Sequence, residues 1–118
     1  MKKLILFGLM CILVITYVYA IQTFRLAPLT YSIVSNTTTV TTSATALPNT
    51  PLVGRESLAI RLNATTDTVC IGGSNVTTAN GFCLDSSIPS ITLDLDDTVV
   101  VYGIIGSGTA DVRTLEIK

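Results

Sequence analysis

The sequence contains no histidine and no tryptophan, and only 13% of its 118 residues are charged. Without histidine, a Ser-His-Asp triad, a Cys-His pair and an imidazole metal site are all excluded. Residues 22–118 carry five Lys or Arg against eight Asp or Glu, which excludes the basic surface of a nucleic-acid-binding protein. No group of residues supplies a nucleophile, a base and an oxyanion donor together, so we expect neither an enzyme nor a bound cofactor.

Hydrophobic residues are concentrated at the N-terminus, where they make up 17 of the first 21 residues but 40 of the other 97. No residue is charged from Leu4 to Phe24, and as a helix this run would span about 32 Å, the thickness of a bilayer core. Lys2 and Lys3 precede the run and Arg25 follows it. This charge pattern places the N-terminus in the cytoplasm and the rest of the chain across the membrane. We therefore predict an N-terminal transmembrane anchor over residues 1–25.

A cleaved signal peptide is the alternative for the same segment. Lys2 and Lys3 would form its basic region, and Val18-Tyr19-Ala20 would be an acceptable cleavage site. The apolar run is longer than the roughly 7–15 residues of a signal-peptide core, which favours the retained anchor.

Threonine dominates the next segment, with seven between Thr37 and Thr50. Because threonine is branched at Cβ, residues 26–50 are predicted to be extended rather than helical. Two interpretations stay open for this juxtamembrane segment: a mucin-like stalk or a first strand. Alternation of Leu29, Tyr31 and Ile33 with polar residues also fits a short strand there.

The remainder, residues 51–118, is predicted to be all-β: a small antiparallel β-sandwich or barrel. Polar and apolar residues alternate with a period of two, and Gly, Asn and Asp clusters separate the alternating segments. The expected strands are 57–62, 69–71, 82–84, 91–95 and 110–117. The apolar run Thr98–Ile105 is expected to be a central strand buried on both faces.

Two cysteines, Cys70 and Cys83, form a disulfide candidate. Each lies between two apolar residues in an expected strand, so both should point away from the core. Two neighbouring strands joined by 72–81 would bring them together, and a bridge closing about 14 residues would stabilise the fold by roughly 3 kcal/mol. Two free buried thiols are the alternative. A disulfide suits a non-cytoplasmic or virion-surface location.

The remaining charged residues suggest no metal site. Asp94, Asp96 and Asp97 are the one acidic cluster, but their spacing does not match a helix-flanked calcium loop. We interpret them as a solvated turn, with Asp94 pointing outward as an edge charge. The three arginines of the predicted domain are expected to be surface or cross-strand residues: Arg55, Arg61 and Arg113.

Four stretches resemble a small β-domain of bacteriophage virion structural proteins: 41–48 (TTSATALP), 51–58 (PLVGRESL), 69–82 (VCIGGSNVTTANGF) and 102–116 (YGIIGSGTADVRTLE). The similarity covers about residues 37–118 and rests on turns and strand patterns. It implies a capsid, head-fibre, decoration or tail-associated module without catalytic residues. The hydrophobic N-terminus departs from that family, and it suggests a virion with an internal membrane.

From this resemblance and the anchor, we expect a membrane-anchored phage virion protein that links a bilayer to the capsid shell. Its β-domain would lie on the non-cytoplasmic side and bind capsid proteins through strand edges and loops, in many copies on a symmetric shell. The alternative is an exported adhesion or carbohydrate-binding module with a cleaved signal peptide. Such modules usually expose aromatic residues, and after Phe24 this chain has only Tyr31, Phe82 and Tyr102.

Overall fold

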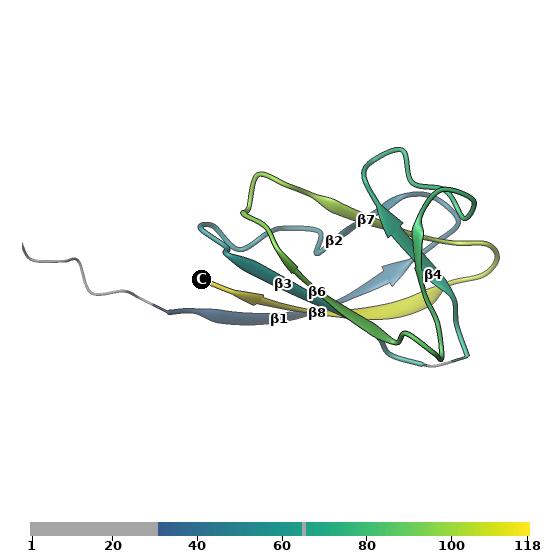
Figure 1. Cartoon of the computed structure of the whole chain (residues 1–118), viewed down its shortest axis with the longest axis horizontal. Coiled ribbons are helices and arrows are strands. Elements are labelled where there is room, and N and C mark those ends of the chain that lie inside the picture. Colours follow the sequence, from purple (N-terminus) through teal and green to yellow (C-terminus); the bar gives the residue numbers. More distant parts are fainter. Residues whose placement is uncertain (1–30, 65) are drawn as a thin grey trace, which may run out of the picture.

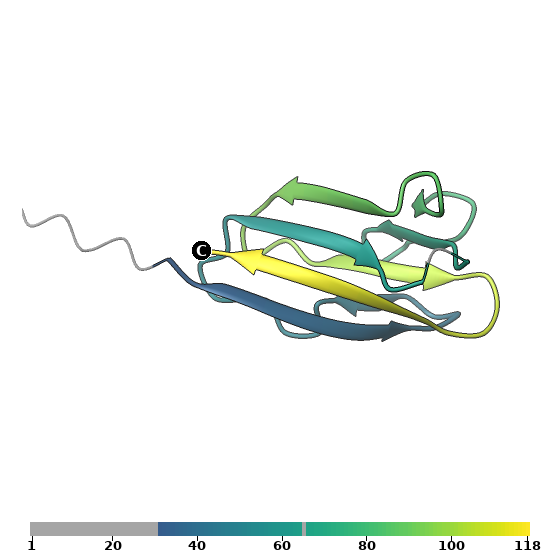
Figure 2. The same cartoon turned by 90° about the horizontal axis from the view of Figure 1, so that it is seen from below.

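Two facing antiparallel sheets make up the computed structural model, which describes residues 31–64 and 66–118 (Figure 1). The first sheet has the order β1-β8-β3-β6 and the second the order β2-β7-β4-β5. Figure 2 shows the strands of the first sheet side by side in that order. The described strands are β1 (Ile33–Val40), β2 (Thr45–Leu47), β3 (Ser57–Leu62), β4 (Val69–Gly72), β5 (Phe82–Leu84), β6 (Ser90–Asp94), β7 (Val101–Ile105) and β8 (Ala110–Ile117).

The predicted all-β class is confirmed for this part of the chain, and of the two architectures expected, a sandwich or a barrel, the structure has two separate sheets as in a sandwich. The predicted anchor at residues 1–25 lies outside the described residues. Within them, no helix is both long and apolar enough to cross a membrane.

Alternation of side chains builds the core between the sheets. Along β8, Val112 and Thr114 are buried and Arg113 and Leu115 are exposed, as expected for a strand with one face covered. The core packs closely enough to require glycine at one position. A Cβ on Gly103 would lie 2.8 Å from Leu47 Cδ1, so the missing side chain lets β7 pack against its neighbours.

The threonine-rich segment is part of the sandwich. β1 pairs with β8 along eight residues, from Ile33 opposite Ile117 to Val40 opposite Ala110. Along β1, Ser35, Thr37 and Thr39 are exposed while Thr38 and Val40 are buried. This pattern is that of a strand with one face covered, which is the strand interpretation and not the stalk. The sandwich therefore begins at Ile33 and not after residue 50. Of the short strand expected from Leu29 to Ile33, residues 29 and 30 lie outside the described residues, and β1 begins at Ile33.

The apolar run Thr98–Ile105 is shorter as a strand than expected. β7 begins at Val101, because Asp96 and Thr98 form a turn in which the Asp96 carboxylate accepts hydrogen bonds from Thr98 N and Oγ1. β7 is central in its sheet, between β2 and β4. It is not buried on both faces, since Tyr102 and Ile104 are partly exposed on the outer one.

Both ends of the described chain lie at the same end of the molecule. The backbones of Ser32 and Lys118 exchange two hydrogen bonds, of 2.9 and 3.2 Å, which extend the β1–β8 ladder. The segment that leads to residues 1–30 and the C-terminus are therefore neighbours (Figure 1).

Candidate functional site

The β4–β5 hairpin carries the predicted disulfide. Cys70 and Cys83 are direct partners in the β4–β5 register and form a disulfide in the structure. Both point to the outer face of the second sheet, while their neighbours Val69 and Leu84 are fully buried in the core. The period-two argument from sequence is confirmed for this pair.

The loop after β4 folds back over the disulfide. Val76 is 5% exposed and Cys70 is 3% exposed, so this loop covers the Cys70 side of the bridge, while Cys83 stays partly exposed. Asn80 holds the loop in shape, because its Oδ1 accepts a hydrogen bond from Thr77 N and its Nδ2 donates to Asn75 O. The disulfide thus joins the two strands of the hairpin, and the loop packs on its Cys70 side.

The acidic cluster forms a turn. Asp94 is exposed on β6, which is an edge strand, as the sequence predicted. Asp96 binds Thr98, and the Asp97 carboxylate accepts a hydrogen bond from Gly54 N at 2.9 Å. The hydrogen bonds from Thr98 lower the pKa of Asp96 below its ordinary value. Across the described ranges 31–64 and 66–118, no three His, Cys, Asp or Glu side chains gather as a metal-binding group.

Arg55 was predicted to be a surface or cross-strand residue, and it is neither: it lies before β3, in no strand, and it is buried. Its side chain is completely buried and pairs with the equally buried Glu116, with Nη1 3.0 Å from Oε2. Its Nη2 donates to the backbone carbonyls of Asp96 and Val99, both at 2.7 Å. A buried charge needs such partners, and here Glu116 on β8 provides the opposite charge.

This arrangement, which we call the Arg55 clasp, joins three segments at the end of the sandwich that carries both termini. Glu116 Oε2 also accepts a hydrogen bond from Leu52 N, so the loop before β3 is tied to β8. The guanidinium of Arg55 ties the turn after β6 to the same point. The clasp therefore fixes the two connecting loops where the chain enters the sandwich.

A groove runs between the edges of the two sheets, on the side where β5 and β6 end them. Ile91 and Leu93 of β6 are half-buried against the core from one sheet, and Ile71 of β4 faces them from the other. The volume of the groove is about 290 Å³. Its lining residues are Ile71, Gly72, Gly73, Phe82, Ile91, Leu93, Val99, Val100 and Val101.

The groove is lined by apolar side chains and two glycines. None of its lining residues is charged, and two large side chains at its rim are exposed: Phe82 at 51% and Val99 at 49%. Beside it, β6 is an edge strand with backbone groups open to a further strand. Such a groove can take apolar side chains of a partner, each contributing about 1.5–3 kcal/mol when fully buried.

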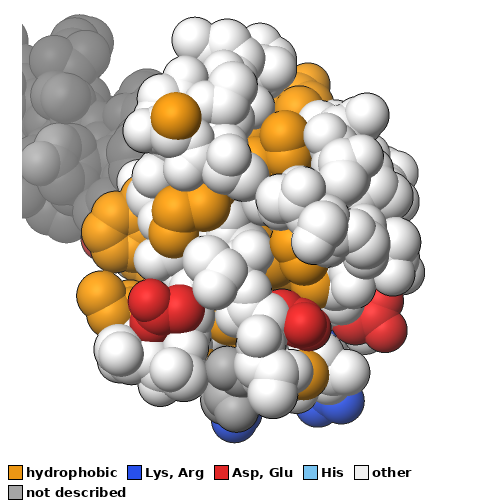
Figure 3. Space-filling model, turned by 90° about the vertical axis from the view of Figure 1, so that its right-hand side faces the viewer, with side chains coloured by type: hydrophobic (Ala, Val, Ile, Leu, Met, Phe, Trp, Pro, Cys, Tyr) orange, Lys and Arg blue, Asp and Glu red, His pale blue; other side chains and the backbone are white. Residues whose placement is uncertain are grey.

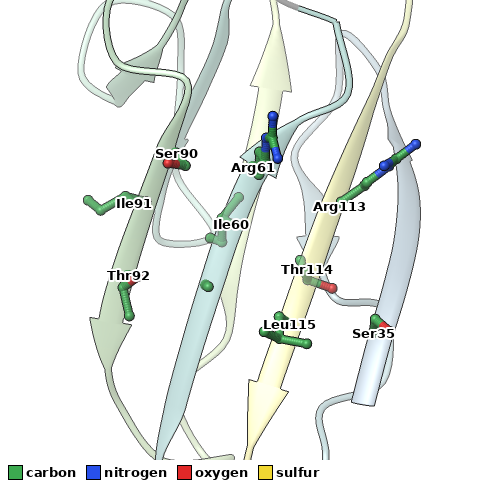
Figure 4. Close-up of a pocket in the computed structure, with 10 residues that line it drawn as sticks. Ser35, Ile60, Arg61, Ser90, Ile91, Thr92, Arg113, Thr114 and Leu115 are labelled. Carbon is green, nitrogen blue, oxygen red and sulfur yellow. The ribbon is translucent and has the colours of Figure 1, made fainter. Parts of the chain in front are cut away.

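Arg61 and Arg113 are exposed, as predicted, and they lie directly opposite each other on β3 and β8. Figure 4 shows both on the outer face of the first sheet, beside Ser90 and Leu115.

The sequence did not predict the groove or the clasp, because both depend on which strands become neighbours. In the sequence, the signal for the clasp is Glu116, an acidic residue at an inward-facing position of the expected strand 110–117.

The chain matches no protein-family model, no curated protein and no solved structure. The resemblance to phage virion β-domains therefore stays a prediction that rests on the sequence stretches alone.

Proposed function

We propose that the protein is a membrane-anchored structural protein of a bacteriophage virion, which connects a bilayer to the protein shell. Residues 4–24 would be the anchor, and the β-sandwich would bind shell proteins through the groove between β5 and β6. The observation that carries the proposal is this uncharged groove with Phe82 and Val99 exposed at its rim, because exposed apolar surface of this kind is typical of protein-binding sites.

The position of the termini supports a one-ended tether. Only eight residues, 25–32, separate the proposed anchor from β1, and fully extended they reach at most about 29 Å. Because the threonine-rich segment belongs to the sandwich, the sandwich itself would span the space above the membrane. β1 alone adds about 26 Å to that reach.

The edge of the sandwich formed by β5 and β6 would then face the shell, because the groove opens there. At the end of the molecule away from the C-terminus, uncharged polar side chains and backbone cover most of the surface, with hydrophobic side chains between them and a few acidic and basic side chains (Figure 3). The Cys70–Cys83 disulfide fits the same orientation, since disulfides persist outside the cytoplasm.

The proposal is tested on purified particles from which detergent has extracted the lipid. We expect the full chain, with residues 1–25 present, to stay with the protein shell at a fixed ratio to the major shell protein. Phe82→Glu should release it from the shell, because a carboxylate in the groove opposes apolar contact. Tyr31→Glu is the matched control, since Tyr31 is also exposed but does not line the groove.

Absence of the chain from the particles, or equal retention of both variants, would overturn the proposal. The exported carbohydrate-binding alternative makes a different forecast. It requires a mature chain that begins near Ile21, is found free in the medium and loses glycan binding when Phe82 is changed.

A further inference from the structure

Two like charges face each other on the outer surface of the first sheet. Arg61 of β3 and Arg113 of β8 are direct register partners, and both are exposed. Like charges directly opposite each other destabilise an antiparallel pair. The chain from 31 to 118 contains only four basic residues, so two of the four are placed where they repel each other.

No carboxylate of the described chain lies within 4 Å of a side-chain nitrogen of Arg61 or Arg113. The ion pair found there within 4 Å is Arg55–Glu116, inside the clasp. Asp111 is the acidic residue nearest in register, two residues before Arg113 on β8, and its Oδ1 accepts a hydrogen bond from Thr39 Oγ1 at 2.7 Å. The donors of Arg61 and Arg113 are therefore available to an external group.

The surroundings of the pair are shaped to hold that group. The arginines line a shallow depression of about 340 Å³, together with Ser35, Ser90 and Thr92. In Figure 4 the two side chains rise from neighbouring strands with their guanidinium ends apart. Thr37 lies opposite Arg113, and Ser90 lies opposite Arg61, so a hydroxyl residue flanks each arginine in the same row.

We propose that Arg61 and Arg113 form a binding site for the carboxylates of an acidic segment of a protein partner. Each planar guanidinium can take one carboxylate in a bidentate pair, and the flanking hydroxyls can donate further hydrogen bonds. The bound carboxylates replace arginine–arginine repulsion with attraction. A partner with two adjacent acidic side chains matches a pair of cations on neighbouring strands.

The choice of a protein rather than a lipid headgroup rests on the proposed function. Arg113 lies opposite Thr37, four residues along β1 from Ile33, or about 13 Å further from the end that leads to the anchor. Ile117 and Leu115 occupy the part of this face nearer that end. The pair therefore points toward neighbouring proteins above the bilayer.

The test uses the full chain in uncharged detergent micelles and a fluorescent hexa-aspartate peptide, with hexa-asparagine as the neutral probe. We expect anisotropy to show binding of the aspartate peptide only, weakening as NaCl is added. Arg61→Gln and Arg113→Gln should each weaken binding roughly tenfold, and the double variant should remove it. Lys118→Gln is the charge-matched control and should bind as the wild type does.

A second measurement separates a binding role from a structural one. Without peptide, Arg61→Gln should raise the melting temperature slightly, because the repulsion is relieved. Undiminished peptide binding by the double variant, equal binding of hexa-asparagine, or no binding of either peptide would overturn the proposal. Arginine-dependent binding to phosphatidylglycerol vesicles, without peptide binding, would assign the site to a headgroup instead. None of these readouts depends on the virion role, so the two proposals fail separately.

Discussion

The end of the sandwich that carries both termini and the β4–β5 hairpin are held together by different chemistry. At the first, the buried Arg55 ties the loop before β3 and the turn after β6 to Glu116 of β8 by charge and hydrogen bonds. At the second, a disulfide joins Cys70 and Cys83, and the buried Val76 of the following loop packs beside it. The stability of the first region depends on a buried ion pair, and that of the second depends on the disulfide being oxidised.

This difference shows how a small domain can stabilise two loop systems independently. The clasp joins segments that are 61 residues apart in sequence, while the bridge joins residues 13 apart in one hairpin. The first holds the sandwich together at the end nearest the proposed anchor. The second shapes a hairpin whose Phe82 lines the groove, so the bridge acts on the candidate binding surface.

The largest effect is expected from breaking the clasp. Arg55→Met leaves Glu116 buried without its countercharge and leaves the carbonyls of Asp96 and Val99 without their donor. We expect the free energy of unfolding to fall by about 3–5 kcal/mol, measured by circular dichroism in urea. Arg61→Met, which changes an exposed arginine, should alter it by less than about 0.5 kcal/mol.

The same experiment separates the charge from the packing. In the double variant Arg55→Met with Glu116→Leu no buried charge is left, so most of the lost stability should return. A double variant as unstable as Arg55→Met alone would show that the hydrogen bonds to the loop carbonyls matter more than the ion pair.

Removing the disulfide should have the next largest effect. Replacing both Cys70 and Cys83 by alanine should cost about 3 kcal/mol, because the unfolded chain regains the freedom of a loop of about 14 residues. Hydrogen exchange should accelerate in 73–81 and stay unchanged in 52–56. Faster hydrogen exchange in both 73–81 and 52–56 would show that the two regions are not independent.

Addition of reductant to the Arg55→Met variant sharpens this comparison. The clasp and the disulfide share no residue. The decreases in the free energy of unfolding caused by losing each of them should therefore add to within about 0.5 kcal/mol. A clear departure from additivity would show coupling through the core.

The strands could be predicted because alternation along one strand is a local property. Residues 57–62 and 110–117 were expected as strands and are β3 and β8, with the expected face inward. The disulfide followed from the same local rule applied to two short strands. The threonine-rich segment was ambiguous because its inward positions hold Thr38 as well as Val40, and threonine fits either environment.

The clasp and the groove could not be predicted because they depend on contacts between distant segments. The burial of Arg55 requires Glu116 opposite it, and nothing near Arg55 in the sequence shows that partner. The turn at Asp96 ends the run that was expected to start β7 at Thr98, since side-chain hydrogen bonds outweigh the apolar pattern there. The groove exists because β5 and β6, rather than other strands, are the edges.

A smaller effect is expected from crowding the hairpin loop. A Cβ on Gly81 would lie 2.8 Å from Val76 Cγ2 and 2.9 Å from Cys70 Cβ, so Gly81→Ala should cost about 1–3 kcal/mol. Gly106→Ala is the control, because its nearest neighbour would be 3.8 Å away. Adding Val76→Ala to Gly81→Ala should not restore full stability, since the disulfide still blocks the site. Equal melting temperatures for the Gly81 and Gly106 variants would contradict this packing.

The smallest effect concerns the turn that the clasp holds. Because hydrogen bonds from Thr98 lower the pKa of Asp96 in the folded protein, the turn is stabilised at pH values above the ordinary pKa of aspartate. That contribution is lost as the pH falls through the lowered pKa. Thr98→Ala should move the pKa of Asp96 upward in an NMR titration, while Thr92→Ala on the outer face should not change it. The loop at 73–81 has no carboxylate, so acidification should loosen the turn at 96–99 first. Hydrogen exchange that accelerates at low pH in both regions together, or first at 73–81, would contradict this difference between them.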